Sequence, residues 1–324
     1  MTAPVAVDVH LTPDHAAQAL REDVLVGLTA RPRWLPPKWF YDARGSELFE
    51  QITRLPEYYP TRAERAILLH RADELAERTS ARSLVELGSG SSEKTRLLLD
   101  SLRGHGSLEE FVPLDVSETA LREAVDAIVA NYPGLKVHGV VGDFTAHLDG
   151  LPGGSPRLVA FLGGTIGNLL PDERRVFLKG VRSVLEPGEW LLLGTDLVKD
   201  PETLVRAYDD AAGVTAQFNL NVLHVLNREL AADFPVESFT HVARWDPENE
   251  WIEMRLRAEH PMTVRIPAVD LELDLAEGEE IRTEISAKFR RERVQDEVAD
   301  AGFHLDAWWT DSGNRFALSL ARAV

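Results

Sequence analysis

The chain has 324 residues, and its 53 acidic against 35 basic residues give a formal net charge of −18. Such a negative field disfavours binding to nucleic acids and to anionic membrane surfaces. The sequence contains no cysteine, which excludes disulfides, thiolate metal sites and cysteine nucleophiles, and its 10 histidines show no metal-ligand spacing. With no secretory signal and no apolar run near the roughly 20 residues that span a bilayer, we expect a soluble, cytoplasmic protein.

The N-terminal part combines one helical pattern with an irregular aromatic stretch. Residues 1 to about 12 are expected to form a loose tail. Residues 13–28 carry apolar side chains at helical spacing, and Thr12 is a plausible N-cap. The pair Pro36-Pro37 excludes a helix in the aromatic stretch 34–42, so we expect these aromatic residues on a loop or turn.

Two further helices are expected before the regular part of the chain. Residues 48–55 suggest a short helix that Pro56 ends. Thr61 and Glu64 have the spacing of a capping box, which predicts a helix running to about Thr79.

From residue 83 the chain alternates apolar strands with amphipathic helices, which predicts a parallel sheet covered by helices on both faces. Ligands of such sheets bind outside the carboxyl ends of the strands. Asp115, Asp143 and Asn168 all fall at such ends. The expected strands are 83–87, 111–115, 136–141, 157–163 and 189–196, and the helices after the first, second and fourth begin near residues 94, 117 and 171.

The pattern changes after residue 200. A helical region to about Leu230 precedes segments with alternating apolar residues, which predict an antiparallel sheet. A helix at 290–301 and two strands then fit the closing hairpin of a methyltransferase-type sheet. The alternating segments are 239–245, 251–257, 263–266, 271–275 and 281–289, and the closing strands are 304–309 and 316–324.

These patterns predict an α/β fold: a Rossmann-like class I methyltransferase sheet with a second, inserted α+β domain that binds substrate. The expected methyltransferase domain covers 63–198 plus 289–324. The expected substrate domain covers 10–62 plus 199–288.

The clearest chemistry lies in the turn after strand 83–87, where Gly88 and Gly90 form a Gly-x-Gly sequence. A dinucleotide, a nucleoside triphosphate or S-adenosylmethionine could occupy such a turn. Both phosphate-binding fingerprints require glycine at the position of Glu93, where a carboxylate would face the phosphates. S-adenosylmethionine carries no phosphate, and Glu86 fits the E/D-x-G-x-G pattern common in methyltransferases. The turn therefore favours S-adenosylmethionine.

Acidic residues at the ends of the next two strands fit recognition of adenosine. Asp115 is placed to accept hydrogen bonds from both ribose hydroxyls, because Ser117 is the better N-cap for the following helix. Asp143 with Phe144 offers an acceptor for the adenine amino group and an aromatic wall, although an ordinary turn explains the pair equally well. Lys94 is a candidate partner for the ligand's carboxylate, or else a solvated lysine.

Candidates for the methyl acceptor's site are fewer. Asn168 follows the fourth strand, where N-methyltransferases place residues that contact the amine, but the N/D-P-P-Y motif of nucleobase enzymes is absent. Glu284 and Ser286 are two apart on an expected strand, so both point to one face and could bind an NH-bearing group such as imidazole. A solvent-facing strand is the alternative interpretation. Tyr58 and Tyr208 are equally consistent with core packing.

Nearly end to end, the chain resembles the histidine-specific, S-adenosylmethionine-dependent N-methyltransferases of ergothioneine biosynthesis. The resemblance implies three methyl transfers to the α-amino group of L-histidine, which give hercynine and release S-adenosylhomocysteine, without a metal. Gly164 is one departure, since we expect serine there in some relatives. The segments that carry the resemblance are 35–42, 55–61, 85–90, 161–168, 196–200, 206–210 and 284–286.

The resemblance also implies a role for individual residues. The cofactor would be held by Gly88, Lys94, Asp115, Asp143 and Phe144. The histidine carboxylate would be held by Asn168 and Tyr208, and the imidazole by Tyr58, Glu284 and Ser286, with Met254 in the same substrate site. Gly163 would lie near the transferring centre. The faces of Tyr41 and Phe49 are candidates for stabilising the growing cation, unless both only pack in the core.

Two other classes of protein stay open. A related methyltransferase acting on tryptophan or tyrosine would have an apolar or neutral side-chain pocket, and the Glu284/Ser286 pair argues against this. A non-enzymatic nucleotide-binding module would use the glycine turn for ATP. The expected partner is the small molecule L-histidine, bound by a monomer that engages neither nucleic acid nor membrane.

Overall fold

The computed structural model describes residues 5–90 and 92–324. The chain divides into two compact units. Unit 1 contains Pro60–Val198, Lys288–Val324 and the described N-terminal residues up to Leu11, and unit 2 contains Thr12–Tyr59 and Lys199–Ala287.

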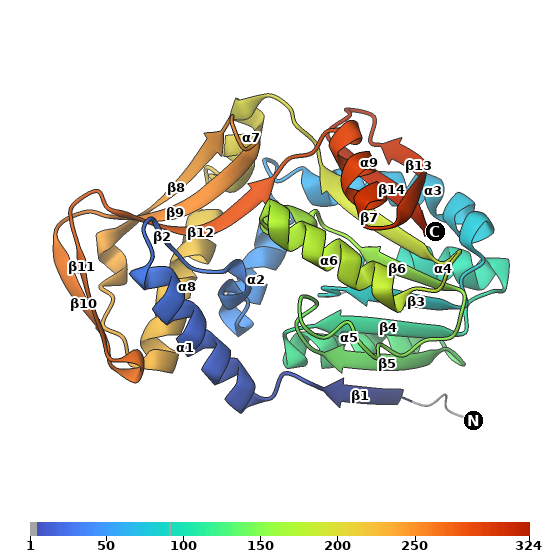
Figure 1. The fold of residues 1–324 in the computed structure, drawn as a ribbon, viewed down its shortest axis with the longest axis horizontal. Coiled ribbons are helices and arrows are strands. Elements are labelled where there is room, and N and C mark those ends of the chain that lie inside the picture. The colour runs from blue at the N-terminus through green and yellow to red at the C-terminus, as the bar shows by residue number, and fades with distance from the viewer. Residues whose placement is uncertain (1–4, 91) are drawn as a thin grey trace. The chain divides into compact units, whose positions relative to one another are not determined.

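Unit 1 is built on an eight-stranded sheet with the order β1-β5-β4-β3-β6-β7-β14-β13 (Figure 1). The five central strands pair in parallel, and β14 runs antiparallel to both β7 and β13. This order confirms the expected class I methyltransferase sheet with its closing hairpin. The strands are β3 (Ser83–Leu87), β4 (Glu110–Asp115), β5 (Lys136–Val141), β6 (Arg157–Phe161), β7 (Trp190–Asp196), β13 (Phe303–Thr310) and β14 (Phe316–Ala323).

Helices cover both faces of this sheet. Because parallel crossovers are right-handed, α4 and α5 lie on one face and α6 lies on the other. α3 packs against α4 and β7, and α9 packs against α6. The strand order reverses between β3 and β6, so their carboxyl ends form the switch point where ligands of such sheets bind. The helices are α3 (Pro60–Thr79), α4 (Arg96–His105), α5 (Glu118–Asn131), α6 (Pro171–Val184) and α9 (Arg291–Asp300).

Three expectations for unit 1 were wrong. β1 (Val5–Val9) pairs in parallel with β5, so this part of the expected tail is an edge strand, whereas residues 1–4 lie outside the described residues (Figure 1). Its Val-Ala-Val-Asp-Val sequence has the β-branched content that strands favour. α3 begins at Pro60, which puts Thr61 inside the helix, where it cannot be the N-cap. α4 begins at Arg96 and not at Lys94.

Unit 2 contains a four-stranded sheet with the order β2-β12-β9-β8, and helices pack against it. β8, β9 and β12 are antiparallel neighbours, while the short β2 pairs in parallel with β12. The strands are β2 (Arg33–Trp34), β8 (Phe239–Asp246), β9 (Trp251–Ala258) and β12 (Glu280–Ala287). The helices are α1 (Pro13–Thr29), α2 (Ala43–Ile52), α7 (Pro201–Tyr208) and α8 (Val214–Leu230). Leu28, Phe40, Val222, Ile252 and Leu256 are fully buried in the core of this unit.

Unit 2 also departs from the predicted pattern. Pro37–Phe40 forms a 3-10 helix, because proline is tolerated at the first position of a helix. β10 (Met262–Ile266) and β11 (Leu271–Leu275) form a separate two-stranded sheet. The helical region after residue 200 breaks after Tyr208, and Asp210 accepts hydrogen bonds from the first backbone N–H groups of α8. Among the described residues, no helix is long and apolar enough to cross a bilayer.

Candidate active site

The glycine turn after β3 has the geometry of a ligand cradle. Gly88 and Gly90 have φ values of +70° and +49°, in the left-handed region that glycine adopts without strain. A Cβ atom on Gly88 would lie 3.9 Å from the Phe144 ring, so the missing side chain leaves room beside that ring. Ser89 Oγ is buried and, within the described part of the chain, has no hydrogen-bond partner. Such an atom suits a polar ligand.

The buried carboxylate of Glu86 binds the loop that follows this turn. Glu86, in β3, accepts hydrogen bonds from Ser92 Oγ at 3.0 Å and from Thr95 Oγ1. Burial raises the pKa of Glu86 to about 7, although the two hydroxyls and the Lys94 ammonium oppose the shift. Glu86, the acidic residue of the E-x-G-x-G pattern, therefore holds the loop after β3 in place through Ser92 and Thr95.

Asp115 lies beside the glycine turn at the end of β4. One carboxylate oxygen accepts from the Gly90 N–H at 2.8 Å, and the other accepts from the Ser117 N–H at 2.9 Å. Burial raises the pKa of Asp115, while these backbone hydrogen bonds partly counteract it. Ser117 caps α5 by accepting from the Ala120 N–H, as predicted. The assignment of Asp115 to a ribose stays a prediction.

Phe144 provides an aromatic surface next to the turn. Its ring packs edge-on against Phe161 and Phe177, with ring centroids 4.9 and 5.7 Å apart. Asp143 accepts from the backbone N–H and the hydroxyl of Thr145 at 2.8 and 2.6 Å, so one of its oxygens stabilises the local turn. The ordinary turn is therefore present, and the role of this pair in binding adenine stays a prediction.

Lys94 is held close to the turn after β6. Its ammonium pairs with Glu64, a wholly buried carboxylate on α3. The Gly163 N–H donates to both oxygens of Glu64, at 2.8 and 3.0 Å. A Cβ atom on Gly163 would lie 3.8 Å from Lys94 Nζ. Lys94 is therefore an oriented, mostly buried cation, and the alternative of a solvated lysine is wrong.

Asn168 ends a short 3-10 helix, Thr165–Asn168, that follows β6. Its side chain is half-buried. Gly164 precedes this helix with a φ of +74°, and a Cβ atom there would lie 3.4 Å from the Phe316 ring. Glycine is thus the favoured residue at the one position where the sequence departs from the expected pattern.

In unit 2 the predicted acceptor residues share one face of the sheet. Glu284 lies opposite Met254 in the register of β12 and β9, and Ser286 lies opposite Ile252. Tyr208, at the end of α7, places its hydroxyl 2.7 Å from Ser286 Oγ. Tyr208, Met254 and Ser286 are buried and Glu284 is half-buried, so a solvent-facing strand is excluded.

A buried polar network supports this face. His241 lies 2.8 Å from the Tyr208 carbonyl through Nε2 and 2.8 Å from the Asn219 amide nitrogen through Nδ1. Burial lowers the pKa of His241, which keeps it neutral, so Nε2 donates and Nδ1 accepts. Asn219 Oδ1 accepts from Thr283 Oγ1 at 2.6 Å, next to a β-bulge that ends at Glu284. The network therefore fixes the backbone at both Tyr208 and Glu284.

An aromatic cluster adjoins the Tyr208–Ser286 pair. Tyr41 and Phe49 contact each other at 5.6 Å between ring centroids, and both contact Phe218. Phe49 contacts Tyr58, and Tyr58 contacts Tyr208, each at 6.3 Å. Tyr41 and Phe49 are half-buried against the core, so their rings are partly accessible.

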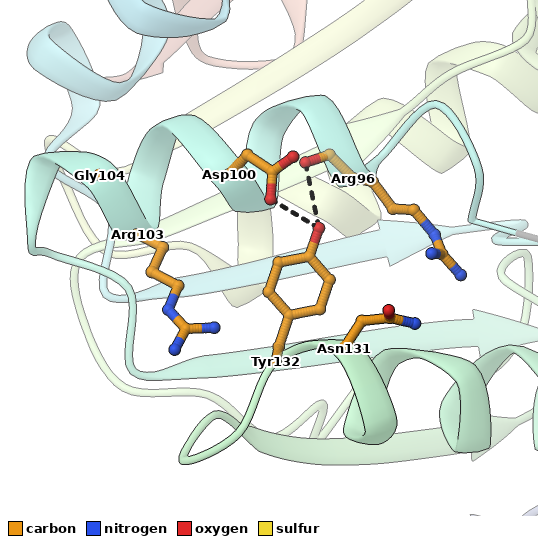
Figure 2. A pocket seen from close by; sticks show the side chains of 6 residues that line it. All are labelled: Arg96, Asp100, Arg103, Gly104, Asn131 and Tyr132. Carbon is orange, nitrogen blue, oxygen red and sulfur yellow. Dashed lines mark hydrogen bonds between the residues drawn. The ribbon is translucent and has the colours of Figure 1, made fainter.

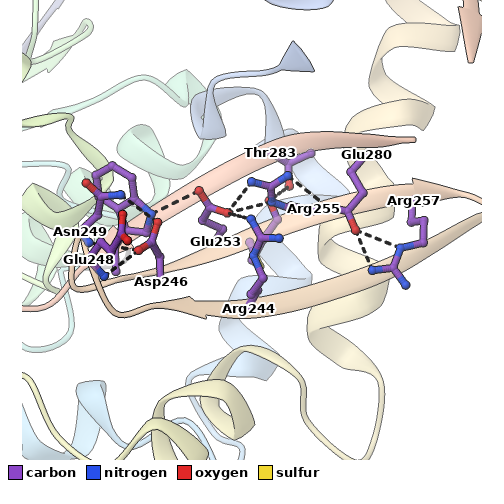
Figure 3. Close-up of polar contacts among 11 residues, drawn as sticks. Arg244, Asp246, Glu248, Asn249, Glu253, Arg255, Arg257, Glu280 and Thr283 are labelled. Atoms are coloured by element: carbon purple, nitrogen blue, oxygen red, sulfur yellow. Dashed lines mark hydrogen bonds and ion pairs between the residues drawn. The ribbon is translucent and has the colours of Figure 1, made fainter. Parts of the chain in front are cut away.

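The other face of this sheet carries ion pairs instead (Figure 3). Glu253 pairs with Arg244 and Arg255 at 2.9 and 2.6 Å, and Glu280 pairs with Arg255 and Arg257 at 3.1 and 2.7 Å. Burial alone would raise the pKa of Glu253, but its arginine partners outweigh this effect and lower it. These charges are satisfied by one another, so this face is structural.

A cavity of about 550 Å³ lies elsewhere in unit 1 (Figure 2). The Tyr132 hydroxyl donates to Asp100 at 2.8 Å there, and burial together with that carboxylate raises the pKa of Tyr132 to about 12. None of the predicted cofactor residues lines this cavity. Its lining residues are Arg96, Asp100, Arg103, Gly104, Asn131 and Tyr132. The described residues contain no cluster of histidine and acidic side chains that could hold a metal ion.

Comparison with known proteins decides the family. The family model described as "Histidine-specific methyltransferase, SAM-dependent" matches residues 20–323. The chain belongs to this family. It is 58% identical over 312 residues to the histidine N-alpha-methyltransferase of Mycolicibacterium smegmatis, covering 96% of this chain and 97% of that protein. It is 57% identical over 317 residues to the enzyme of the same name from Mycobacterium tuberculosis, covering 98% and 99%.

A third relative is longer. The ergothioneine biosynthesis protein 1 of Neurospora crassa is 31% identical over 324 residues, which cover 98% of this chain and 35% of that protein. The match therefore occupies about a third of the fungal protein.

Several well-placed residues of this histidine-specific methyltransferase were missed in the sequence. The spacing of Glu64 from Thr61 predicts a capping box, and nothing in the sequence links Glu64 to Lys94 and Gly163. Asn219 and His241 lie in an ordinary helix and strand, and only the folded chain brings them together. Glu86, in contrast, is identified by its place in the sequence, two residues before Gly88.

Proposed function

We propose that this protein is an S-adenosylmethionine-dependent L-histidine Nα-methyltransferase. It transfers three methyl groups to the α-amino group and gives hercynine for ergothioneine biosynthesis. The observation that carries this function is the identity of 57–58%, over nearly the whole chain, to two histidine N-alpha-methyltransferases. The name of the Neurospora relative supports the pathway.

The residues around the glycine turn fit S-adenosylmethionine. Gly88 admits the ligand against the backbone beside Phe144, whose ring would form a wall for the adenine. Asp115 would accept from the ribose hydroxyls, and Asp143 would accept from the adenine amino group. Lys94 would bind the carboxylate of the cofactor's amino-acid part. Bound S-adenosylmethionine supplies an already activated methyl group.

The face of β12 and β9 fits the imidazole of histidine. Glu284 would accept from an imidazole N–H, and Ser286 and Tyr58 would complete the ring's contacts. A site built to bind a substrate N–H rejects analogues that lack it. Met254 would pack against the substrate, since it lies opposite Glu284 in the register. Tyr208, already fixed by Ser286 and His241, would hold the histidine carboxylate.

For the transfer itself, positioning is the main contribution, because aligned reactants cross the barrier without a nucleophilic residue. Gly163 would lie near the transferring centre, and Asn168 would contact the histidine carboxylate. Each transfer breaks the sulfonium–methyl bond, releases S-adenosylhomocysteine and loses one amine proton to water, so that three transfers give a fixed quaternary cation. The half-buried rings of Tyr41 and Phe49 would stabilise this cation, since a cation–π contact contributes about 0.5–2 kcal/mol.

Incubation of the protein with S-adenosylmethionine and each amino acid separately, followed by mass spectrometry, tests this function. Histidine should gain one, two and finally three methyl groups, and no other amino acid should do so. A methyl gain on tryptophan or tyrosine instead would favour the related methyltransferase. Binding of ATP without any methyl transfer would favour the nucleotide-binding module. The monomeric state and the cytoplasmic location stay predictions.

A further inference from the structure

Glu64 is a buried carboxylate that the proposed chemistry does not yet use. Its side chain has no exposed surface, although glutamate is almost never fully buried unless it is paired. Its partners are the Lys94 ammonium and the Gly163 N–H, which lie on two separate loops. One side chain of α3 therefore joins the loop before α4 to the turn after β6.

Gly194 in β7 leaves space for the Glu64 carboxylate. A Cβ atom on Gly194 would overlap Glu64 Oε1. Only glycine at this position leaves space for the carboxylate. The absence of exposed surface also means that a ligand cannot reach Glu64 without rearrangement, so the residue acts through its partners.

We propose that Glu64 is a positioning residue that orients the Lys94 ammonium, and with it the Gly163 turn, for the amino-acid part of S-adenosylmethionine. This inference rests on the proposed function, in which Lys94 binds the cofactor's carboxylate. Lysine has a flexible four-carbon stem, so without a fixed partner its ammonium moves into solvent. An ammonium has three N–H donors. Pairing with Glu64 uses part of this capacity and fixes the position of the ammonium, so the remaining donors can bind a ligand carboxylate.

The test compares Glu64→Gln with the unaltered protein by calorimetric titration of two ligands. S-adenosylhomocysteine carries the amino-acid part, and methylthioadenosine lacks it. Charge-assisted hydrogen bonds are worth about 1.5–3 kcal/mol, so we expect S-adenosylhomocysteine to bind at least about ten-fold more weakly to the variant. Methylthioadenosine should bind both proteins equally. Glu77→Gln, an exposed substitution on the same helix, is the matched control and should change neither affinity.

A double-mutant cycle with Lys94→Met separates positioning from a general structural role. In the Lys94→Met background, Glu64→Gln should cause no further loss of S-adenosylhomocysteine affinity. Equal losses for both ligands, unchanged affinity for S-adenosylhomocysteine, or additive losses in the cycle would overturn the role of Glu64. If Glu64→Gln does not fold, Glu64→Asp, which keeps the charge but shortens its reach, takes its place with the same expectations. Methylation of histidine by the unaltered protein tests the proposed function independently.

Discussion

The Tyr208 hydroxyl lies 2.7 Å from Ser286 Oγ, and both side chains are buried. The bond joins the end of α7 to β12, two elements far apart in the sequence. His241 fixes the Tyr208 backbone from the other side at 2.8 Å. The phenol is therefore placed before any substrate arrives, which reduces the entropy lost on binding.

Replacing Tyr208 with phenylalanine removes the hydroxyl that is proposed to hold the histidine carboxylate. A hydrogen bond to a charged group is worth about 1.5–3 kcal/mol, so we expect the KM for histidine to rise by about ten-fold or more. The affinity for S-adenosylhomocysteine, measured by calorimetry, should stay unchanged. Equal weakening of both ligands would mean that the substitution disturbs the fold and not the histidine site.

Glu284 should set the preference for histidine. In Glu284→Ala, the loss of a charge-assisted hydrogen bond to the imidazole should weaken histidine by at least about ten-fold. Calorimetric titration of histidine in the presence of S-adenosylhomocysteine measures this change. Glu280→Gln is the matched control, because Glu280 lies in the same strand but pairs with Arg255 and Arg257 on the other face. Unaltered affinity in Glu284→Ala would show that the imidazole binds elsewhere.

Phe49→Ala should slow the last methylation more than the first. Its ring is half-buried beside Tyr41, and its loss removes a cation–π contribution of about 0.5–2 kcal/mol from the quaternary ammonium that only the third methylation forms. Mass spectrometry at fixed times should then show mono- and dimethylated histidine accumulating, while histidine still binds. Phe49→Tyr, which keeps an aromatic face, should retain trimethylation. An unchanged product distribution in Phe49→Ala would assign the ring to core packing alone.

Glu86 makes the stability of the protein depend on pH. Its pKa rises from 4.5 to about 7 on burial, so the folded state holds a proton that the unfolded chain releases between these values. The contribution of Glu86 to the free energy of unfolding therefore falls as pH rises from about 4.5 to 7, by as much as ~3 kcal/mol. The difference in unfolding free energy between the native protein and Glu86→Gln should decrease over this window. A difference independent of pH would mean that Glu86 is not protonated on burial.

Local patterns in the sequence predicted the sheet of unit 1 well. Glycines, apolar runs and strand-ending acids are adjacent in sequence, so Gly88, Asp115 and Ser117 could be placed before the fold was known. The alternation of β12 likewise put Glu284 and Ser286 on one face. Each of these features is set by residues within a single element or a single turn.

Contacts between distant elements could not be predicted in this way. Glu64 and Thr61 have capping-box spacing, yet the folded chain uses Glu64 to hold Lys94 and Gly163. The Tyr208–Ser286 and His241–Asn219 contacts require the packing of α7 and α8 on the sheet. β1 was missed because a five-residue edge strand gains most of its stability from pairing with β5.

The position and number of the added methyl groups test the central claim most directly. The protein should be incubated with L-histidine and isotopically labelled S-adenosylmethionine, and the product examined by nuclear magnetic resonance. We predict three equivalent labelled methyl groups on the α-nitrogen and an unmodified imidazole. Labelled methyl groups on an imidazole nitrogen, or no labelled histidine while another amino acid is methylated, would contradict the account.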